Sequence, residues 1–183
     1  MIVAGVELRA RRDDDLDECE RLARAVLEAD GYPPRCAADL RSFISTPDAL
    51  GAWVAEWDGG IVGHVALQPS GSPEVMARAA DATGRPPGQL CVVARLFVSP
   101  SHRGKGIGRS LLAGAAEAGR TRGLWPILDV AAHFATAIRL YEGAGWTCAG
   151  RVSAAFPGEE PLDELVYVAP GLDGAGRPIA RKS

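Results

Sequence analysis

The sequence has few aromatic residues, no long apolar run and no excess of basic residues. Phe, Trp and Tyr make up 6% of its 183 residues, so small and branched aliphatic side chains must form most of the core. No apolar stretch approaches the roughly 20 residues that a helix needs to cross a bilayer. The net charge of −3 argues against general nucleic-acid binding, for which a basic surface is typical. We therefore expect neither a nucleic acid nor a membrane as a partner.

The cysteines do not have the spacing of a metal site or of a disulfide framework. They are Cys19, Cys36, Cys91 and Cys148, too far apart in sequence to form the C-x-x-C pair of a zinc site. We expect them to be ordinary small apolar residues, with no bound metal. The amino-terminal residues lack the basic region and the apolar stretch of a secretory signal, so we expect a cytoplasmic protein.

Length and composition suit one globular domain. Apolar residues make up 47% of the chain and charged residues 23%, and the length lies within the usual range of a single domain. We expect the domain to cover residues 1–169. Residues 170–183 have few apolar side chains to pack, so we expect a flexible tail there.

The first half of the chain predicts a strand, two helices and a hairpin. Residues 6–10 alternate as in a strand, and apolar residues recur at helical spacing over residues 16–29, which Gly31 ends. A short helix is expected at residues 40–44. Two strands, at residues 52–57 and 61–67, flank Asp-Gly-Gly, a strong hairpin signal.

The second half predicts alternating strands and helices. Its expected helices cover residues 74–83, 107–122 and 135–144, and its expected strands cover residues 90–98, 126–130, 146–152 and 162–168. A strand–helix–strand crossover is typical of parallel pairing. The fold class is therefore α/β, with a mixed, twisted sheet of about six or seven strands flanked by about four helices.

The most informative segment is a glycine-rich turn between a buried strand and a helix. Residues 103–108 read R-G-K-G-I-G. Glycines allow a ligand to approach the backbone closely, and the first turn of a helix has free N–H groups, so the turn suits a phosphate or pyrophosphate. The Walker pattern fails because Gly106 follows Lys105, and the G-x-G-x-x-G pattern of dinucleotide-binding proteins fails at its third glycine.

The pattern that fits is R-x-x-G-x-G, formed by Arg103, Gly106 and Gly108. Residues 128–146 read L-D-V-A-A-H-F-A-T-A-I-R-L-Y-E-G-A-G-W, and residues 56–67 read E-W-D-G-G-I-V-G-H-V-A-L. With these three segments in order, residues 6–168 resemble the GNAT superfamily of acetyl-CoA-dependent N-acetyltransferases. The resemblance implies the single-domain fold of that family, with acetyl-CoA as cosubstrate.

The resemblance also implies which residues contact acetyl-CoA. Backbone groups of one strand would pair with the pantetheine arm, and the turn would hold the pyrophosphate with its amides and basic side chains. Where the family often has an Asn that contacts the cofactor, this chain has Phe134. The implied cofactor-binding residues are Leu96, Phe97, Val98, Arg103, Gly104, Lys105, Gly106, Ile107, Gly108, Arg109, Ser110 and Phe134.

By the same resemblance, Tyr141 falls on the tyrosine that protonates the departing CoA thiolate, although its position also suits a core residue of an amphipathic helix. The base that deprotonates the amine is open, because the strand at residues 90–98 has no acidic residue. His64 is one candidate, since the ordinary pKa of histidine lies near neutrality; a structural histidine and a water relay are alternatives. The other candidates are Glu56, Asp129 and His133.

The acceptor side of the site has fewer signals. Tyr32 follows the first helix, where the family's acceptor site is usually walled, and can line it or pack in a turn. Glu159 and Glu160 lie in a turn that can overhang the acceptor or face solvent.

We expect acetyl transfer to a primary amine of a small molecule or peptide, by direct attack in a ternary complex. The alternative is a CoA-binding sensor or interaction module without catalysis. The sequence does not choose between a monomer and a homodimer, and it does not identify the acceptor.

Overall fold

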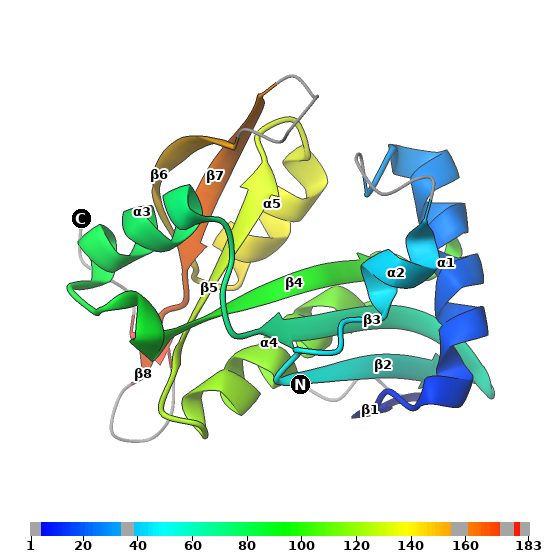
Figure 1. Ribbon diagram of the computed structural model, residues 1–183. Helices are drawn as coiled ribbons and strands as arrows, with labels where there is room; N and C mark the ends of the chain where they lie inside the picture. Colours follow the sequence, from blue (N-terminus) through cyan, green and yellow to red (C-terminus); the bar gives the residue numbers. More distant parts are fainter. Residues whose placement is uncertain (1–4, 34–38, 155–160, 173–177, 180–183) are drawn as a thin grey trace. The chain divides into compact units, whose positions relative to one another are not determined.

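The computed structural model describes residues 5–33, 39–154, 161–172 and 178–179 (Figure 1). The chain divides into two compact units, each made of two stretches of sequence. The first unit contains Met1–Gln68 and Val93–Ala118, and the second contains Pro69–Val92 and Gly119–Ser183. Strand β4 (Leu90–Val98) contributes its beginning to the second unit and its end to the first.

The strands form a mixed sheet. Their hydrogen-bonded order is β1-β2-β3-β4 in the first unit and β4-β5-β7-β6 in the second. The β4–β5 pair is parallel, whereas the β1–β2, β2–β3, β5–β7 and β6–β7 pairs are antiparallel. The predicted α/β fold with a mixed sheet of six or seven strands is thus confirmed. The described residues form five α-helices, one at each of the five ranges predicted as helical.

In the first unit, tight turns set the strand and helix boundaries. Asp58 and Gly59, with φ of 49° and 78°, form the turn of the predicted hairpin. The first α-helix of the unit, Leu16–Asp30, is ended by Gly31, whose φ of 73° places it in the left-handed region. The elements of this unit are β1 (Val6–Ala10), α1 (Leu16–Asp30), α2 (Leu40–Ile44), β2 (Gly51–Trp57), β3 (Gly60–Gln68), the end of β4, and α4 (Ile107–Arg120).

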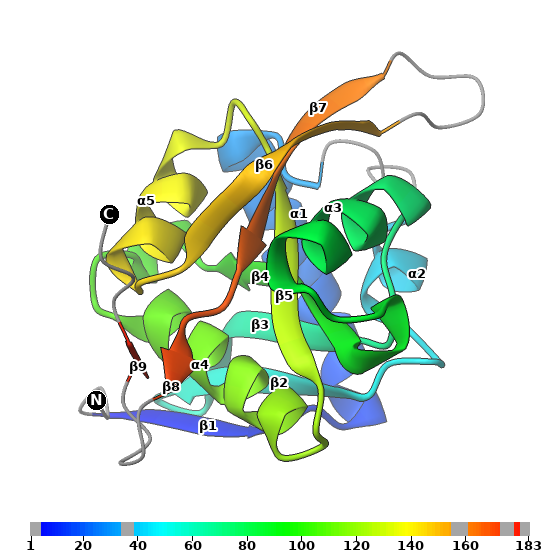
Figure 2. The same ribbon diagram turned by 90° about the vertical axis from the view of Figure 1, so that its left-hand side faces the viewer.

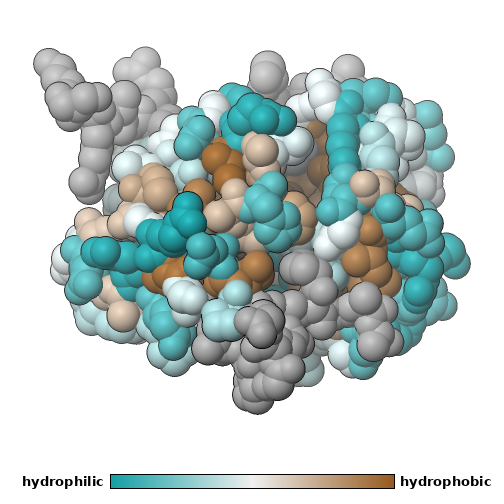
Figure 3. Space-filling view, turned by 90° about the horizontal axis from the view of Figure 1, so that it is seen from above, coloured by the Kyte–Doolittle hydropathy of each residue, from teal (hydrophilic) through white to brown (hydrophobic). Residues whose placement is uncertain are grey.

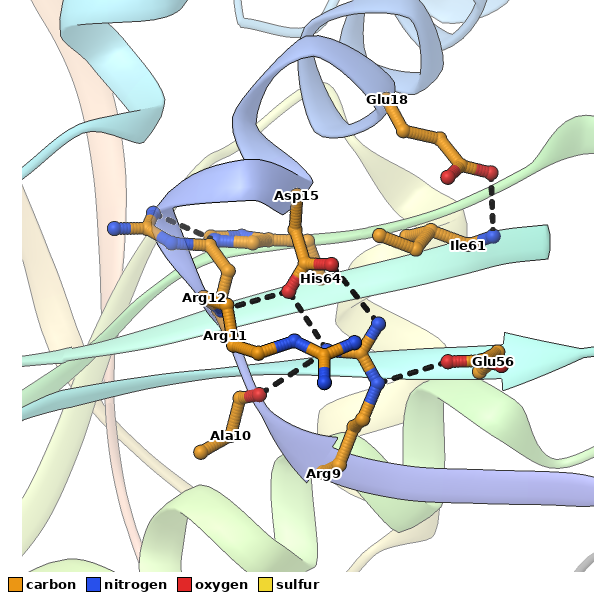
Figure 4. Close-up of polar contacts among 9 residues, drawn as sticks. All are labelled: Arg9, Ala10, Arg11, Arg12, Asp15, Glu18, Glu56, Ile61 and His64. Atoms are coloured by element: carbon orange, nitrogen blue, oxygen red, sulfur yellow. Dashed lines mark hydrogen bonds and ion pairs between the residues drawn. The ribbon is translucent and has the colours of Figure 1, made fainter. Parts of the chain in front are cut away.

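Three aspartates precede α1. Asp13–Asp15 form a short 3-10 helix, and Asp15 makes no side-chain cap hydrogen bond to α1. Its carboxylate instead accepts hydrogen bonds from the Arg12 backbone N–H at 2.6 Å and from the Arg9 guanidinium at 2.7 and 2.9 Å. Arg9 also donates to Glu56 on β2 at 2.8 Å, so it ties the start of α1 to the sheet (Figure 4).

Helices cover both faces of the strands in the first unit. Helices α1 and α2 lie on one face and α4 on the other (Figures 1 and 2). The core on the α1–α2 side includes Val26, Ile44 and Phe97. On the α4 side the packing is close, because a Cβ added to Gly63 of β3 would lie 2.8 Å from a methyl group of Leu111.

The second unit contains α3 (Pro73–Thr83), the beginning of β4, β5 (Trp125–Ala131), α5 (Ala135–Gly143), β6 (Thr147–Ala154) and β7 (Leu162–Val168). Helix α3 packs against β6 and β7, and α5 packs against β6, on the opposite side of these strands (Figure 2). The helix expected at residues 74–83 is therefore confirmed as α3, and it has buried residues. Within the expected tail, β8 (Gly171–Leu172) and β9 (Pro178–Ile179) pair antiparallel.

The surface carries few large exposed apolar side chains. Leu8, at 40% exposure, is the one found among the described residues. On the face drawn in Figure 3, hydrophobic residues form small areas separated by hydrophilic ones. Within the described ranges, no helix has both the length and the apolar character that crossing a membrane requires.

Candidate active site

The glycine-rich turn connects β4 to α4 in the first unit. A short 3-10 helix, Pro100–His102, follows β4, and Gly104 and Gly106 then adopt φ of 75° and 86°. The Gly106 carbonyl accepts the hydrogen bond of the Ser110 N–H at 3.0 Å. This is the first hydrogen bond of α4, so the N–H groups of residues 106–109 have no acceptor within the helix. An added Cβ on Gly104 would meet no atom within 4 Å, so the turn is open at this residue.

The basic side chains of this turn have defined contacts in the structure. Arg103 forms a two-pronged ion pair with Asp30, the last residue of α1, with Nη1 2.9 Å from Oδ1 and Nη2 against Oδ2. The Lys105 ammonium lies 4.4 Å from the ring centroid of Trp57. Arg109 is exposed. Sequence analysis identified neither Asp30 nor Trp57, and no local signal marks them, because each lies far from the turn in sequence.

Strand β4 has an unusual backbone just before its expected cofactor-binding residues. Arg95 has a φ of 54°, in the left-handed region that residues other than glycine rarely adopt. Phe97 is buried in the core, whereas Leu96 and Val98 are half-buried. Phe97 therefore has its side chain in the core, and only its backbone remains for the expected pairing with the pantetheine arm.

His64 on β3 is fully buried in the first unit. Its Nδ1 lies 3.0 Å from the Arg95 carbonyl oxygen. Its Nε2 lies 3.4 Å from Nη1 of Arg11 (Figure 4). A guanidinium can only donate, so Nε2 accepts from Arg11, and Nδ1 carries the proton and donates to the carbonyl. Burial lowers the pKa of His64 from 6.5 to about 4, and the charges of Arg11 and Arg95 add to this effect.

Tyr32 lies at the end of α1, in the first unit. Its ring packs edge-on against Phe43 of α2, with centroids 6.0 Å apart, and the Arg95 guanidinium lies 5.1 Å from the same Phe43 ring. Tyr32 thus joins a half-buried cluster with Phe43 and Arg95.

Tyr141 and Phe134 lie in the second unit, around α5. Tyr141 is 7% exposed, and its ring centroid lies 5.9 Å from that of Tyr167. Burial raises the pKa of the Tyr141 hydroxyl, and the negative charge of Asp129 raises it further. Phe134 precedes α5, and its ring centroid lies 4.2 Å from that of His133. It therefore places an aromatic ring at the position where the resemblance implies the amide of an Asn.

The remaining candidates have structural partners or fall outside the described residues. The Glu56 carboxylate accepts a hydrogen bond from the Arg9 guanidinium. Burial raises the pKa of Cys19 to about 12 and that of Cys91 to about 11, as expected of unreactive apolar cysteines. No group of three or more His, Cys, Asp or Glu suited to a metal occurs in the part of the chain that the structure describes. Cys36, Glu159 and Glu160 lie outside that part.

A glycine turn at a strand–helix junction of an α/β sheet is typical of proteins that bind phosphorylated ligands. Comparison with known families narrows this class. The model of the acetyltransferase (GNAT) family matches residues 14–146. This match covers more than half of the chain, which therefore belongs to the GNAT family.

Solved structures share the fold at low sequence identity. An N-acetyltransferase from Staphylococcus aureus Mu50 matches with a TM-score of 0.67 and 18% identity, covering 90% of this chain and 98% of its own. YncA from Salmonella typhimurium, solved with its cofactor acetyl-CoA, has a TM-score of 0.63 and 18% identity, with coverage of 97% and 99%. The ribosomal-protein-S18-alanine N-acetyltransferase from Escherichia coli has a TM-score of 0.62 and 18% identity, with coverage of 97% and 96%. Among curated protein sequences, no significant match is found.

Proposed function

We propose that this protein is an N-acetyltransferase that moves the acetyl group of acetyl-CoA to a primary amine by direct attack in a ternary complex. The observation that carries the proposal is the open glycine turn at the start of α4 in a member of the GNAT family. The acetyl-CoA complex of YncA and the N-acetyltransferase names of two structural neighbours support it.

The turn fits the pyrophosphate of acetyl-CoA. The backbone amides of residues 103–109 would hold it, because consecutive N–H groups at a helix start bind anions. Ser110 closes the first turn of α4, and Arg109 adds an exposed positive charge. When bound, acetyl-CoA supplies an acetyl group activated as a thioester. In our proposal the backbone of Leu96–Val98 aligns the pantetheine arm of acetyl-CoA. This alignment would raise the rate by orienting the thioester toward the amine.

Tyr141 is our candidate for the acid that protonates the departing thiolate. Its pKa is raised by burial, so the hydroxyl keeps its proton at neutral pH. Within the described part of the chain, the structure gives this hydroxyl no hydrogen-bond partner. The proton is therefore not committed to a neighbouring acceptor, which suits a general acid.

We propose that the amine loses its proton through water rather than to His64. A base needs a free lone pair, and the Nε2 lone pair of His64 accepts from Arg11. Glu56 is occupied by Arg9. Strand β4 has no acidic residue that could take this role.

Two glycines on one helix provide the test. Gly108→Glu places a carboxylate in the first turn of α4, and we expect it to abolish acetyl-CoA binding measured by calorimetry. Gly114→Glu is the matched control, because Gly114 is exposed on α4 and an added Cβ there meets no atom within 4 Å. Equal, undiminished affinity in both variants would show that the pyrophosphate binds elsewhere.

Thiol release from acetyl-CoA across a panel of amines tests catalysis itself. An enzyme releases CoA only when a suitable amine is present. The second candidate function is that of a CoA sensor, which is motivated by Phe134 in place of the Asn amide. A sensor would bind acetyl-CoA and release no thiol with any amine.

A further inference from the structure

The strained backbone of β4 requires a local cause. Arg95 adopts a φ of 54° in the middle of a strand. For a residue with a side chain, this conformation costs free energy relative to the extended one, so its surroundings must hold it in place. Leu96–Val98, the expected cofactor-binding residues, follow directly, and their direction depends on this residue.

His64 contacts β4 at two points around this residue. Its Nδ1–H donates to the Arg95 carbonyl at 3.0 Å. Its ring stacks on Phe97 with centroids 5.0 Å apart and an interplanar angle of 19°. A side chain on β3 therefore supplies the hydrogen bond to the carbonyl of the strained residue and also packs against the next inward-facing residue of β4.

Two arginines complete a ring of contacts that returns to His64. Nη1 of Arg11 lies 3.4 Å from His64 Nε2 (Figure 4). The same nitrogen donates to the Ile44 carbonyl at 2.6 Å. Nε of Arg95 donates to the carbonyl of Phe43. Both carbonyls belong to the last turn of α2, whose C-terminal carbonyls lack partners within the helix. The ring thus connects β3, β4 and α2 through His64.

We propose that His64 is a positioning residue, which sets the backbone of β4 at Arg95 and so the direction of the Leu96–Val98 amides toward acetyl-CoA. This inference rests on the proposed function for its catalytic consequence, but the effect on β4 does not depend on the cofactor. His64 acts through the hydrogen bond that its Nδ1–H donates to the Arg95 carbonyl. It does not act by taking a proton from the amine.

The two nitrogen positions of His64 can be mimicked separately. Asparagine places its amide N–H near the position of Nδ1, so His64→Asn retains the donor to the Arg95 carbonyl. His64→Gln reaches toward Arg11 and loses that donor, and His64→Leu loses both contacts. If Leu does not fold, as judged by circular dichroism, the comparison of Asn with Gln decides.

The first measurement is amide hydrogen exchange of residues 95–98 without cofactor. We expect wild-type exchange in His64→Asn, and exchange about tenfold faster or more in His64→Gln and His64→Leu. Wild-type exchange in all three variants, or equally fast exchange in all three, would overturn the proposal. This comparison stands even if the wild-type protein neither binds nor turns over acetyl-CoA, a result that would instead refute the proposed function.

The second measurement is thiol release together with acetyl-CoA affinity. We expect His64→Asn to stay within about threefold of wild type in both, while His64→Gln binds acetyl-CoA about tenfold more weakly. If His64→Asn binds normally but loses turnover as completely as His64→Gln, His64 is the base and the positioning role is wrong.

Discussion

The buried neutral state of His64 predicts that stability falls as the solution is made mildly acidic. The pKa of His64 is lowered from 6.5 to about 4 by burial. Between these two values the unfolded chain binds a proton that the folded protein does not. Stability is therefore complete above pH 6.5 and is lost as the pH falls toward 4.

The size of this effect follows from the difference of about 2.5 units between the two pKa values. It corresponds to about 3 kcal/mol in total, of which about 2 kcal/mol is lost between pH 7 and pH 4.5. The charged groups that face His64 are the guanidinium groups of Arg11 and Arg95. Asp15 acts lower, because its hydrogen bonds with Arg9 depress its pKa to about 2, so its contribution is lost only below about pH 4.

Urea unfolding followed by tryptophan fluorescence at pH 7 and pH 4.5 measures the loss. His64→Asn is the matched variant, because asparagine keeps the donor to Arg95 and does not titrate. We expect wild type to lose about 2 kcal/mol more than this variant over the interval. The same loss in both proteins would refute the reasoning, as would an NMR titration in which the His64 ring protonates near pH 6.5.

Three further predictions concern other contacts. Tyr141→Phe should lower the rate of thiol release about a hundredfold while acetyl-CoA affinity stays unchanged; an unchanged rate would leave Tyr141 a packing residue. Asp30→Asn should weaken acetyl-CoA binding by about two- to fivefold, because the freed Arg103 no longer holds the turn; calorimetry measures this. Gly63→Ala should cost about 1 kcal/mol in urea unfolding through overpacking against α4, whereas Gly114→Ala on the exposed face of α4 should stabilise.

The order of helices and strands could be predicted because local signals mark it. Gly31 and Gly84 end α1 and α3 with positive φ, as glycine favours, and Asp58-Gly59 turns the hairpin. The glycine turn was equally visible, because its residues are consecutive. Local patterns alone therefore gave the fold class and the expected cofactor turn.

The contacts that position the site could not be predicted. Asp30 and Arg103 are 73 residues apart in sequence, and His64 meets the Arg95 carbonyl across 31 residues. The positive φ of Arg95 has no sequence signal, because arginine does not favour it and only the folded surroundings impose it. The ion pair between the Asp30 carboxylate and the Arg103 guanidinium in the glycine turn has no sequence signal either.

The Asp30–Arg103 pair also limits how this scaffold can be redesigned. Asp30 is the last residue of α1, and Gly31 and Tyr32 follow it directly. A grafted segment meant to change acceptor preference would join the chain at this point. Such a graft must begin after Asp30, since replacing that residue would also remove the ion pair with Arg103 in the turn that we propose for the pyrophosphate of acetyl-CoA.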